Sequence, residues 1–309
     1  MSLRFLTWLL FVFAQCFSAF SWSQPNEAGC STSSEAERVW VALLGAHDHM
    51  SFEGTLLYER IGGRQFIDVA WSAGSGEARL RRLNRVSDPS EEFWSPPTLN
   101  VGRFCDLRRF YVPRIEQGRV IAGRSTRRLA LQPTDTLRLG YIAEVDTETG
   151  VPLGMVTVDP DGKVLERYEF ASIATSGANE TLANPDRAIS EESSGALARG
   201  KDVLPGYYMV NDHATPAAFV VSDGLATASV FLEPLPAGAT PGEAGVSEGA
   251  TLAYTRGVPV PGQKGVLISV LGEVPMVTAR LLADAIRPTN EAPQIRALHR
   301  PTRGLRAEG

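Results

Sequence analysis

The sequence lacks the short motifs that mark several large enzyme classes. It contains no S-x-x-K or H-E-x-x-H segment and no phosphate-binding glycine loop. Its G-x-S-x-G match, residues 245–249, lies in residues 234–249, which are expected to be a loop of Pro, Gly and Ala, and is not the elbow between a strand and a helix that hydrolases use. These observations exclude the usual forms of those hydrolase, zinc-protease and nucleotide sites. Histidine is scarce, with four residues, of which His47 and His49 are close together. A metal site there would need a third ligand, and such a pair at a helix end is more often a solvated turn. The residues therefore predict neither an enzyme nor a metal or other cofactor.

Excess basic charge is also absent, and cysteine is rare. The chain has 30 Lys and Arg against 35 Asp and Glu, so its overall charge gives no sign of nucleic-acid binding. Arginine is concentrated between Arg60 and Arg128, which suits either an anionic ligand or ordinary solvent-facing strand positions. Of the three cysteines, Cys16 lies in a segment expected to be removed. Cys30 and Cys105 then form either one disulfide or two unpaired thiols.

The N-terminus has the order of a secretory signal peptide. Arg4 precedes an apolar run at residues 5–13, and a small-x-small site follows at residues 21–23. The run is too short to cross a bilayer, and no later segment is apolar for long enough to stop transfer. We therefore expect residues 1–23 to be cleaved and the rest to be an exported, soluble protein.

A first domain is predicted over residues 33–173. Ser34 and Glu37 form a capping box that begins a helix. The residues that follow at helical spacing are Ala36, Val39, Trp40, Leu43 and His47. Strand-length runs separated by Gly and Pro turns then occupy residues 51–60, 65–71, 77–86, 128–132, 137–145, 152–158 and 164–170. Strands joined by tight turns pair antiparallel, so the sequence predicts a curved antiparallel sheet with the helix on its concave face.

A smaller mixed α/β domain is predicted at residues 203–287, after a linker at 174–202. Its expected strands are residues 217–222, 225–233, 251–256 and 266–271, and its expected helix is 276–286. Asp223-Gly224 is a hairpin signal, and Pro275 suits the first turn of the helix. Residues 288–309 have no apolar pattern and are expected to be a disordered tail. The predicted fold class is thus α+β with two domains.

A series of short segments resembles the segments of a known protein family, in the same order. In chain order they are SFEGTLLYER (51–60), IAGR (121–124), GY (140–141), DTETGVPL (146–153), DGKVLER (161–167), LPGY (204–207), SDGL (222–225), SVFLE (229–233), GEVP (272–275) and TAR (278–280). Together they resemble the periplasmic RseB/MucB regulators of the extracytoplasmic-stress sigma factor. The resemblance spans about residues 35–286. Two segments depart from the family: the one between residues 76 and 121 is shorter than the family's, which leaves the size of a cavity open, and the linker at residues 174–199 is also compact.

The resemblance implies a fold and a function. The first domain would be a half-barrel like those of the lipoprotein carriers LolA and LolB, with the helix as its lid. The protein would bind the periplasmic part of a membrane anti-sigma factor of the RseA/MucA type and shield it from regulated proteolysis. It would release the anti-sigma factor on sensing lipopolysaccharide or the acyl chains of mislocalised lipoproteins. Such a protein is periplasmic and binds no nucleic acid.

Two sets of residues are predicted to carry these contacts. The predicted partner-binding residues are Asp223, Gly224, Leu225, Phe231, Glu273 and Pro275. The predicted lipid-cavity residues are Trp40, Phe52, Leu56, Tyr58, Arg81 and Arg82, in which the arginines would suit lipid phosphates. Ordinary structure explains many of them too: a type I′ turn for Asp223-Gly224, core for Phe52, and helix entry for Glu273.

One other function fits the same sequence. A periplasmic lipid or lipoprotein carrier would use the first-domain cavity without a regulatory partner, although the second domain argues against a bare carrier. A hydrolase has no residue constellation to support it. The sequence leaves open which lipid is sensed, whether the chain forms homo-oligomers, and whether Cys30 pairs with Cys105.

Overall fold

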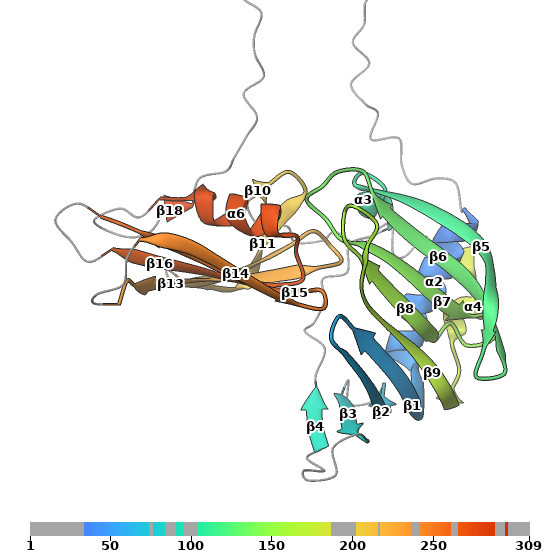
Figure 1. The fold of residues 1–309 in the computed structure, drawn as a ribbon. Coiled ribbons are helices and arrows are strands. Elements are labelled where there is room, and N and C mark those ends of the chain that lie inside the picture. Colours follow the sequence, from blue (N-terminus) through green and yellow to red (C-terminus); the bar gives the residue numbers. More distant parts are fainter. Residues whose placement is uncertain are drawn as a thin grey trace, which may run out of the picture. The chain divides into compact units, whose positions relative to one another are not determined.

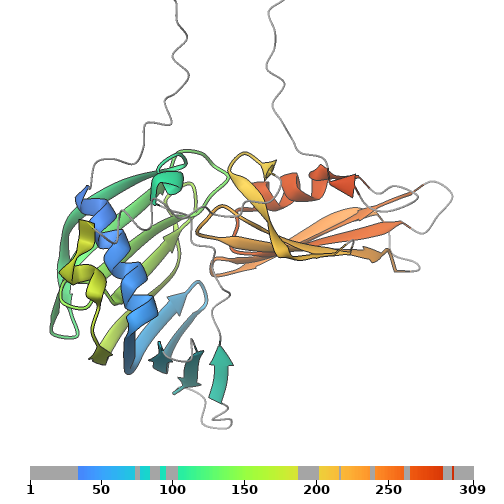
Figure 2. The same cartoon turned by 180° about the vertical axis from the view of Figure 1, so that it is seen from behind.

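The computed structural model of the chain contains two antiparallel sheets (Figures 1 and 2). It describes residues 34–73, 77–83, 91–94, 104–186, 202–215, 217–236, 241–260, 265–287 and 294–295. The predicted signal peptide, most of the predicted linker and most of the predicted tail lie outside these residues. None of the helices in the described part is long and apolar enough to cross a membrane.

The first sheet has nine strands in the order β4-β3-β2-β1-β9-β8-β7-β6-β5. Its strands are β1 (Met50–Arg60), β2 (Gly63–Ser72), β3 (Glu77–Arg82), β4 (Glu91–Trp94), β5 (Tyr111–Ile121), β6 (Arg124–Pro133), β7 (Gly140–Asp146), β8 (Pro152–Val158) and β9 (Val164–Gly177). Two meanders, β1–β4 and β5–β9, are joined by the antiparallel pairing of β1 with β9. The expected open antiparallel sheet is confirmed.

Helix α2 (Glu35–His49) packs on one face of this sheet, as Figure 2 shows from the helix side. Ser34 is the N-cap, and its hydroxyl accepts a hydrogen bond from the backbone N–H of Glu37 at 3.2 Å. The predicted stripe is confirmed at Trp40, which is 4% exposed, but is wrong at His47, which is exposed. The helix continues to His49, and the short helix α4 (Glu180–Ala183) packs beside it.

Two apolar clusters lie between α2 and the sheet. The first gathers Trp40 with residues of the short helix α3 (Phe104–Leu107), β5 and β6. The second gathers Ala46, Met50 and Phe170 with Ile121, with Val151 before β8 and with Leu153 of β8. Burying a side chain of this size contributes about 1.5–3 kcal/mol, so these clusters fix α2 on the sheet.

Several strands of the first domain differ from the expectation: β4 was not predicted, β3 is shorter than residues 77–86, and β6 is longer than residues 128–132. Strand β5 was not predicted, because Pro113 interrupts its pattern, yet an edge strand tolerates proline. Strand β9 continues to Gly177 because its far end pairs with the start of β1, so the predicted linker begins within this sheet. Residues 137–139 were predicted as strand but lie in the loop before β7.

The second sheet has seven strands in the order β10-β11-β12-β13-β16-β15-β14. Its strands are β10 (Asp202–Leu204), β11 (Tyr207–Thr215), β12 (Ala218–Ser222), β13 (Thr227–Pro234), β14 (Gly242–Glu248), β15 (Thr251–Val258) and β16 (Val266–Gly272). A small pair, β17 (Ile286–Arg287) and β18 (Gln294–Ile295), follows α6 (Met276–Ala285). Strand β14 was predicted as loop, because an edge strand exposed on both faces shows no alternation of burial.

Helix α6 covers one face of the second sheet (Figures 1 and 2). Val230, Tyr254 and Ile268 point to that face and are almost fully buried with Leu282 of the helix. Strands β12 and β13 are joined by a four-residue turn, Asp223 to Ala226, rather than by the predicted type I′ turn. Only Gly224 has a positive φ there, at 97°, whereas a type I′ turn requires two such residues.

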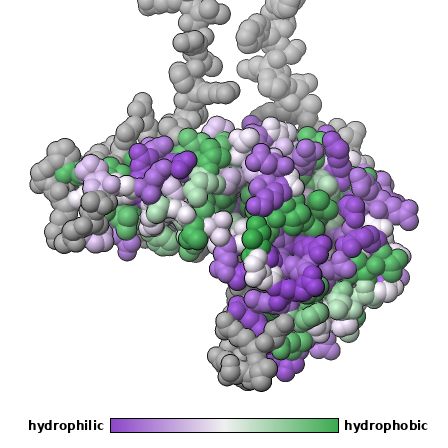
Figure 3. Space-filling model, in the orientation of Figure 1, coloured by the Kyte–Doolittle hydropathy of each residue, from purple (hydrophilic) through white to green (hydrophobic). Residues whose placement is uncertain are grey.

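Figure 3 shows the face of the first sheet that lies opposite α2, where hydrophobic side chains adjoin a band of hydrophilic ones. A depression of about 350 Å³ on this face is lined by Ile142 and Val156 beside Arg128 and Glu169. Arg128 donates to the Glu144 carboxylate at 2.7 and 2.8 Å. Arg128 is thus tied to an acid of the neighbouring strand β7.

Candidate partner-binding and lipid-binding sites

The loop between β6 and β7 carries a fully buried arginine to the second sheet. The side chain of Arg138 is 0% exposed. Its guanidinium donates to the Asp135 carboxylate and, at 2.5 Å, to the carbonyl oxygen of Pro205. Its Nε lies 3.5 Å from the Asp223 carboxylate. A buried cation is stable only with such partners, so this set of contacts, which we call the junction, is specific to one arrangement of the chain.

Aromatic rings complete the environment of this arginine. The Arg138 guanidinium lies 4.2 Å from the centre of the Phe110 ring and 5.1 Å from that of Tyr207. The negative face of an aromatic ring attracts a cation. The hydroxyl of Tyr207 and the Oγ1 of Thr278 also donate to the carbonyl oxygen of Leu137, at 2.9 and 2.6 Å. The loop is therefore held by strand β11, which carries Tyr207, and by helix α6, which carries Thr278.

The predicted partner-binding turn at Asp223 is part of the junction. One carboxylate oxygen of Asp223 accepts the backbone N–H groups of Leu225 and Ala226, both at 2.9 Å. The other accepts the hydroxyl of Tyr111 at 2.9 Å. Burial raises the pKa of Asp223, and these donors oppose that rise. Leu225 packs against the Trp40 cluster of the first domain.

A second contact between the two sheets lies at the turn from β14 to β15. The Glu166 carboxylate accepts the Tyr58 hydroxyl at 2.8 Å and the backbone N–H of Ala250 at 3.0 Å. Arg60 forms an ion pair with Glu248, whose side chain is 66% exposed. We call this set the edge contact. Burial and then the hydrogen bond to Glu166 raise the pKa of Tyr58. Tyr58 was predicted to line the lipid cavity, and its hydroxyl is instead bound at this contact.

The remaining predicted partner-binding residues lie on the second sheet and at the start of its helix. Pro275 is the N-cap of α6, and the backbone N–H of Glu273 donates to the Thr227 carbonyl at 3.1 Å. Loss of solvent around its carboxyl and then the negative charge of Glu166 raise the pKa of Glu273, although Glu273 as a whole residue is exposed. Phe231 is 39% exposed on the face that α6 does not cover.

The predicted lipid-cavity residues divide between the two faces of the first sheet. Trp40 is buried against Phe104, with ring centres 6.3 Å apart. Phe52 and Leu56 are half-buried beside Phe170 on the same side as α2. Phe52 meets Phe170 edge-on at 5.9 Å. The structure therefore brings the apolar members together under the helix.

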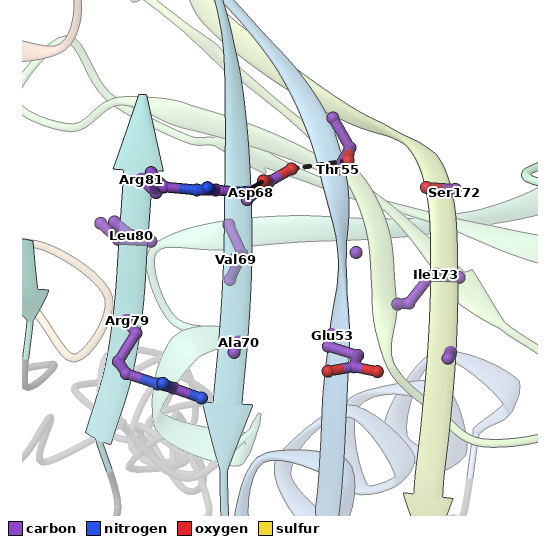
Figure 4. A pocket seen from close by; sticks show the side chains of 12 residues that line it. Glu53, Thr55, Asp68, Val69, Ala70, Arg79, Leu80, Arg81, Ser172 and Ile173 are labelled. Atoms are coloured by element: carbon purple, nitrogen blue, oxygen red, sulfur yellow. Dashed lines mark hydrogen bonds and ion pairs between the residues drawn. The ribbon is translucent and has the colours of Figure 1, made fainter. Parts of the chain in front are cut away.

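Arg81 lies on the opposite face, in a shallow groove of about 690 Å³ (Figure 4). Its guanidinium donates to the Asp68 carboxylate at 2.5 Å, and Thr55 donates to the same carboxylate at 2.8 Å. Arg82 alternates to the face that carries Phe52. The two arginines therefore do not share one site, and Arg81 already has an acidic partner.

Cys105 lies in α3 and is disulfide-bonded. Cys30 lies outside the described residues, so the pairing of Cys105 with Cys30 stays a prediction. Sequence reasoning missed the most constrained polar residues, Arg138 and Glu166. One signal for Arg138 is its position between two leucines, where a lone cation in an apolar run needs buried partners.

Comparisons with known proteins agree in pointing to one family. The MucB/RseB N-terminal domain family matches residues 95–191, and the MucB/RseB C-terminal domain family matches residues 201–287. The sigma factor AlgU regulatory protein MucB of Pseudomonas aeruginosa is 28% identical over an alignment of 289 residues, and the match covers 81% of this chain and 90% of that protein.

Solved structures give the same result. The MucA/MucB complex of Pseudomonas aeruginosa contains a chain that is 25% identical, with a TM-score of 0.62 over 85% of this chain and 100% of that one. MucB in complex with MucA(peri) matches at 26% identity and a TM-score of 0.60, over 82% of this chain and 99% of that one. These matches span both sheets, and the chain belongs to the MucB/RseB family.

Proposed function

We propose that this protein is a periplasmic regulator that binds the periplasmic part of a MucA-like anti-sigma factor. The observation that carries the proposal is that the chain matches, over both of its sheets, the MucB found in complexes with MucA. In the proposed role, binding shields the anti-sigma factor from the protease that would degrade it, so the sigma factor stays sequestered.

Release would follow from the binding of a lipid or lipoprotein acyl chain to the first domain. A ligand shifts such an equilibrium only by the difference between its affinities for the two states. The half-buried apolar residues under α2, including Phe52 and Leu56, support this role, because they offer apolar surface on the side of the helix lid. Movement of α2 would expose more of it.

A titration tests the proposal. The full mature chain is mixed with the fluorescently labelled periplasmic segment of the MucA-like protein from the same cell, and anisotropy is followed. We expect binding at micromolar concentration or tighter, weaker binding after addition of lipopolysaccharide, and slower cleavage of the segment by its site-1 protease. Absence of binding at micromolar concentrations, with or without lipid, would contradict the proposal. Lipid binding without any partner binding would instead favour the carrier function.

A further inference from the structure

The two faces of the second sheet differ in what covers them. Val230, Tyr254 and Ile268 point to α6 and are almost fully buried. The strand register places the residues between them on the other face, across which no helix of the described residues packs. We call this second surface the open face.

Exposed apolar side chains gather on the open face. One row across the strands consists of Val220, Ser229, Leu271, Ala253 and Val246, each paired in register with the next. Leu271 is 47% exposed and Val246 is 69% exposed. The neighbouring row contains Phe231, at 39%. Three of the large apolar side chains that reach solvent therefore share one side of one sheet, which is typical of a binding surface.

The charged residues that the second sheet itself places on or beside this face are acidic. Of the strand positions on the open face from β12 to β14, the charged ones are Glu233 and Glu248, and Glu273 follows directly after β16. Arg60 forms an ion pair with Glu248. No ion pair joins Glu233 or Glu273 to another of the described residues. Glu273 also faces the Glu166 carboxylate closely enough for the repulsion to raise its pKa.

We infer that the open face binds a segment of the anti-sigma factor that combines apolar residues with lysine or arginine. The apolar residues would pack on Leu271, Phe231 and Val246. A cation beside Glu273 would relieve its repulsion with Glu166 and would make binding dependent on salt. This inference rests on the proposed function and adds to it the surface and the chemistry of the partner segment.

Matched lysine variants test the surface. In Leu271→Lys an exposed apolar side chain of the open face becomes a cation. Val277→Lys is the control: it also turns an exposed apolar side chain into a cation, but Val277 lies on α6, on the other side of the sheet, where it is 41% exposed. The probe is the labelled periplasmic segment used above. We expect Leu271→Lys to raise its Kd about tenfold or more, as for a central interface residue, and Val277→Lys to leave Kd within about twofold.

The charge is tested separately. Glu273→Gln keeps the shape of the side chain and removes its charge. We expect Kd to rise about threefold at low salt and the difference to shrink at 0.5 M salt, because screening weakens the lost attraction. An affinity that is unchanged at low salt would overturn the cationic part of the inference.

The outcomes separate this inference from the proposed function. If the unsubstituted protein does not bind the segment, the proposed function fails. If it binds, and Leu271→Lys and Val277→Lys bind equally well, the open face is not the site and the proposed function stands. If Leu271→Lys changes only the mass of the protein in solution, the face joins two copies of this chain, which also overturns the inference. Thermal unfolding checks that each variant is folded. If Leu271→Lys is not folded, Leu271→Ser takes its place in the binding measurement.

Discussion

The junction and the edge contact both join the two sheets, but they differ in burial. At the junction, Arg138 is 0% exposed and its partner Asp223 has a fully buried carboxylate. At the edge contact, Arg60 is 28% exposed and Glu248 is 66% exposed. Breaking a buried pair leaves a charge without solvent, whereas water replaces an exposed partner at little cost. The difference suggests a permanent connection on one side and a releasable one on the other.

The largest effect is expected from the junction. Arg138→Met keeps most of the side-chain volume but leaves Asp223 and Asp135 without their cation. We expect a loss of about 3–5 kcal/mol in the free energy of unfolding, measured by urea denaturation, because an uncompensated buried carboxylate remains. Arg280→Met is the control, since Arg280 is 53% exposed in its ion pair with Glu243, and should cost less than about 1 kcal/mol. Equal losses in the two variants would remove the distinction between buried and exposed contacts.

The local pattern of the sequence predicted most strands but not the junction. Residues 152–158 were predicted as a strand with the bounds that β8 has, because Gly150 and Pro152 punctuate that segment. Arg138 lies in residues 137–145, which the alternation of apolar residues marked as strand. Its role depends on Asp223 and Pro205, far along the chain, and no local signal encodes such a pairing. Tertiary contacts therefore decided the conformation of this loop.

For the predicted sites, too, the sequence identified residues but not their tertiary partners. Asp223 was singled out from a turn motif, and the structure shows its carboxylate bound to Tyr111 within the protein. Arg81 was singled out for its charge, and its acidic partner Asp68 lies on the neighbouring strand. Composition identifies charged residues but not the face on which a strand presents them, because a shift of one residue reverses the face. The contacts of these residues with a partner or a lipid stay predictions.

An intermediate effect is expected at the edge contact. Gly249 has φ +64°, and a Cβ there would meet the Glu166 carboxylate. Gly249→Ala combines a strained backbone with a steric clash and should cost about 1–3 kcal/mol. Gly62→Ala is the control, since Gly62 has φ +89° with nothing within 4 Å of an added Cβ. Urea denaturation measures both losses, and their difference isolates the contact with Glu166.

Gly249→Ala also tests whether the edge contact is releasable. If it is, the substitution should expose Tyr58 to solvent while the junction stays intact. Hydrogen exchange of the Ala250 amide should become faster, and that of Leu225 and Ala226 at the junction should not change. Faster exchange at both places would mean that the two contacts open together, and the comparison between them would not hold.

The smallest effect is expected from Glu273, beside the edge contact. Loss of solvent and the charge of Glu166 raise its pKa in the folded state. Its ionised form therefore destabilises the folded protein. This penalty is absent below the pKa of the unfolded state, where the carboxyl is protonated in both states, and develops as the pH rises through the folded-state value. Removing the charge should then stabilise the protein at neutral pH only.

Glu273→Gln should raise Tm at pH 7 by about 1–2 °C and leave it unchanged near pH 3. Glu248→Gln provides the opposite case, because Glu248 has a cationic partner in Arg60, and should lower Tm slightly or not at all. A fall in Tm at pH 7 for Glu273→Gln would mean that Glu273 already has a favourable partner in the free protein. Repulsion between Glu273 and Glu166 would then not destabilise the free protein, and a cation of the partner segment could gain no affinity by relieving it.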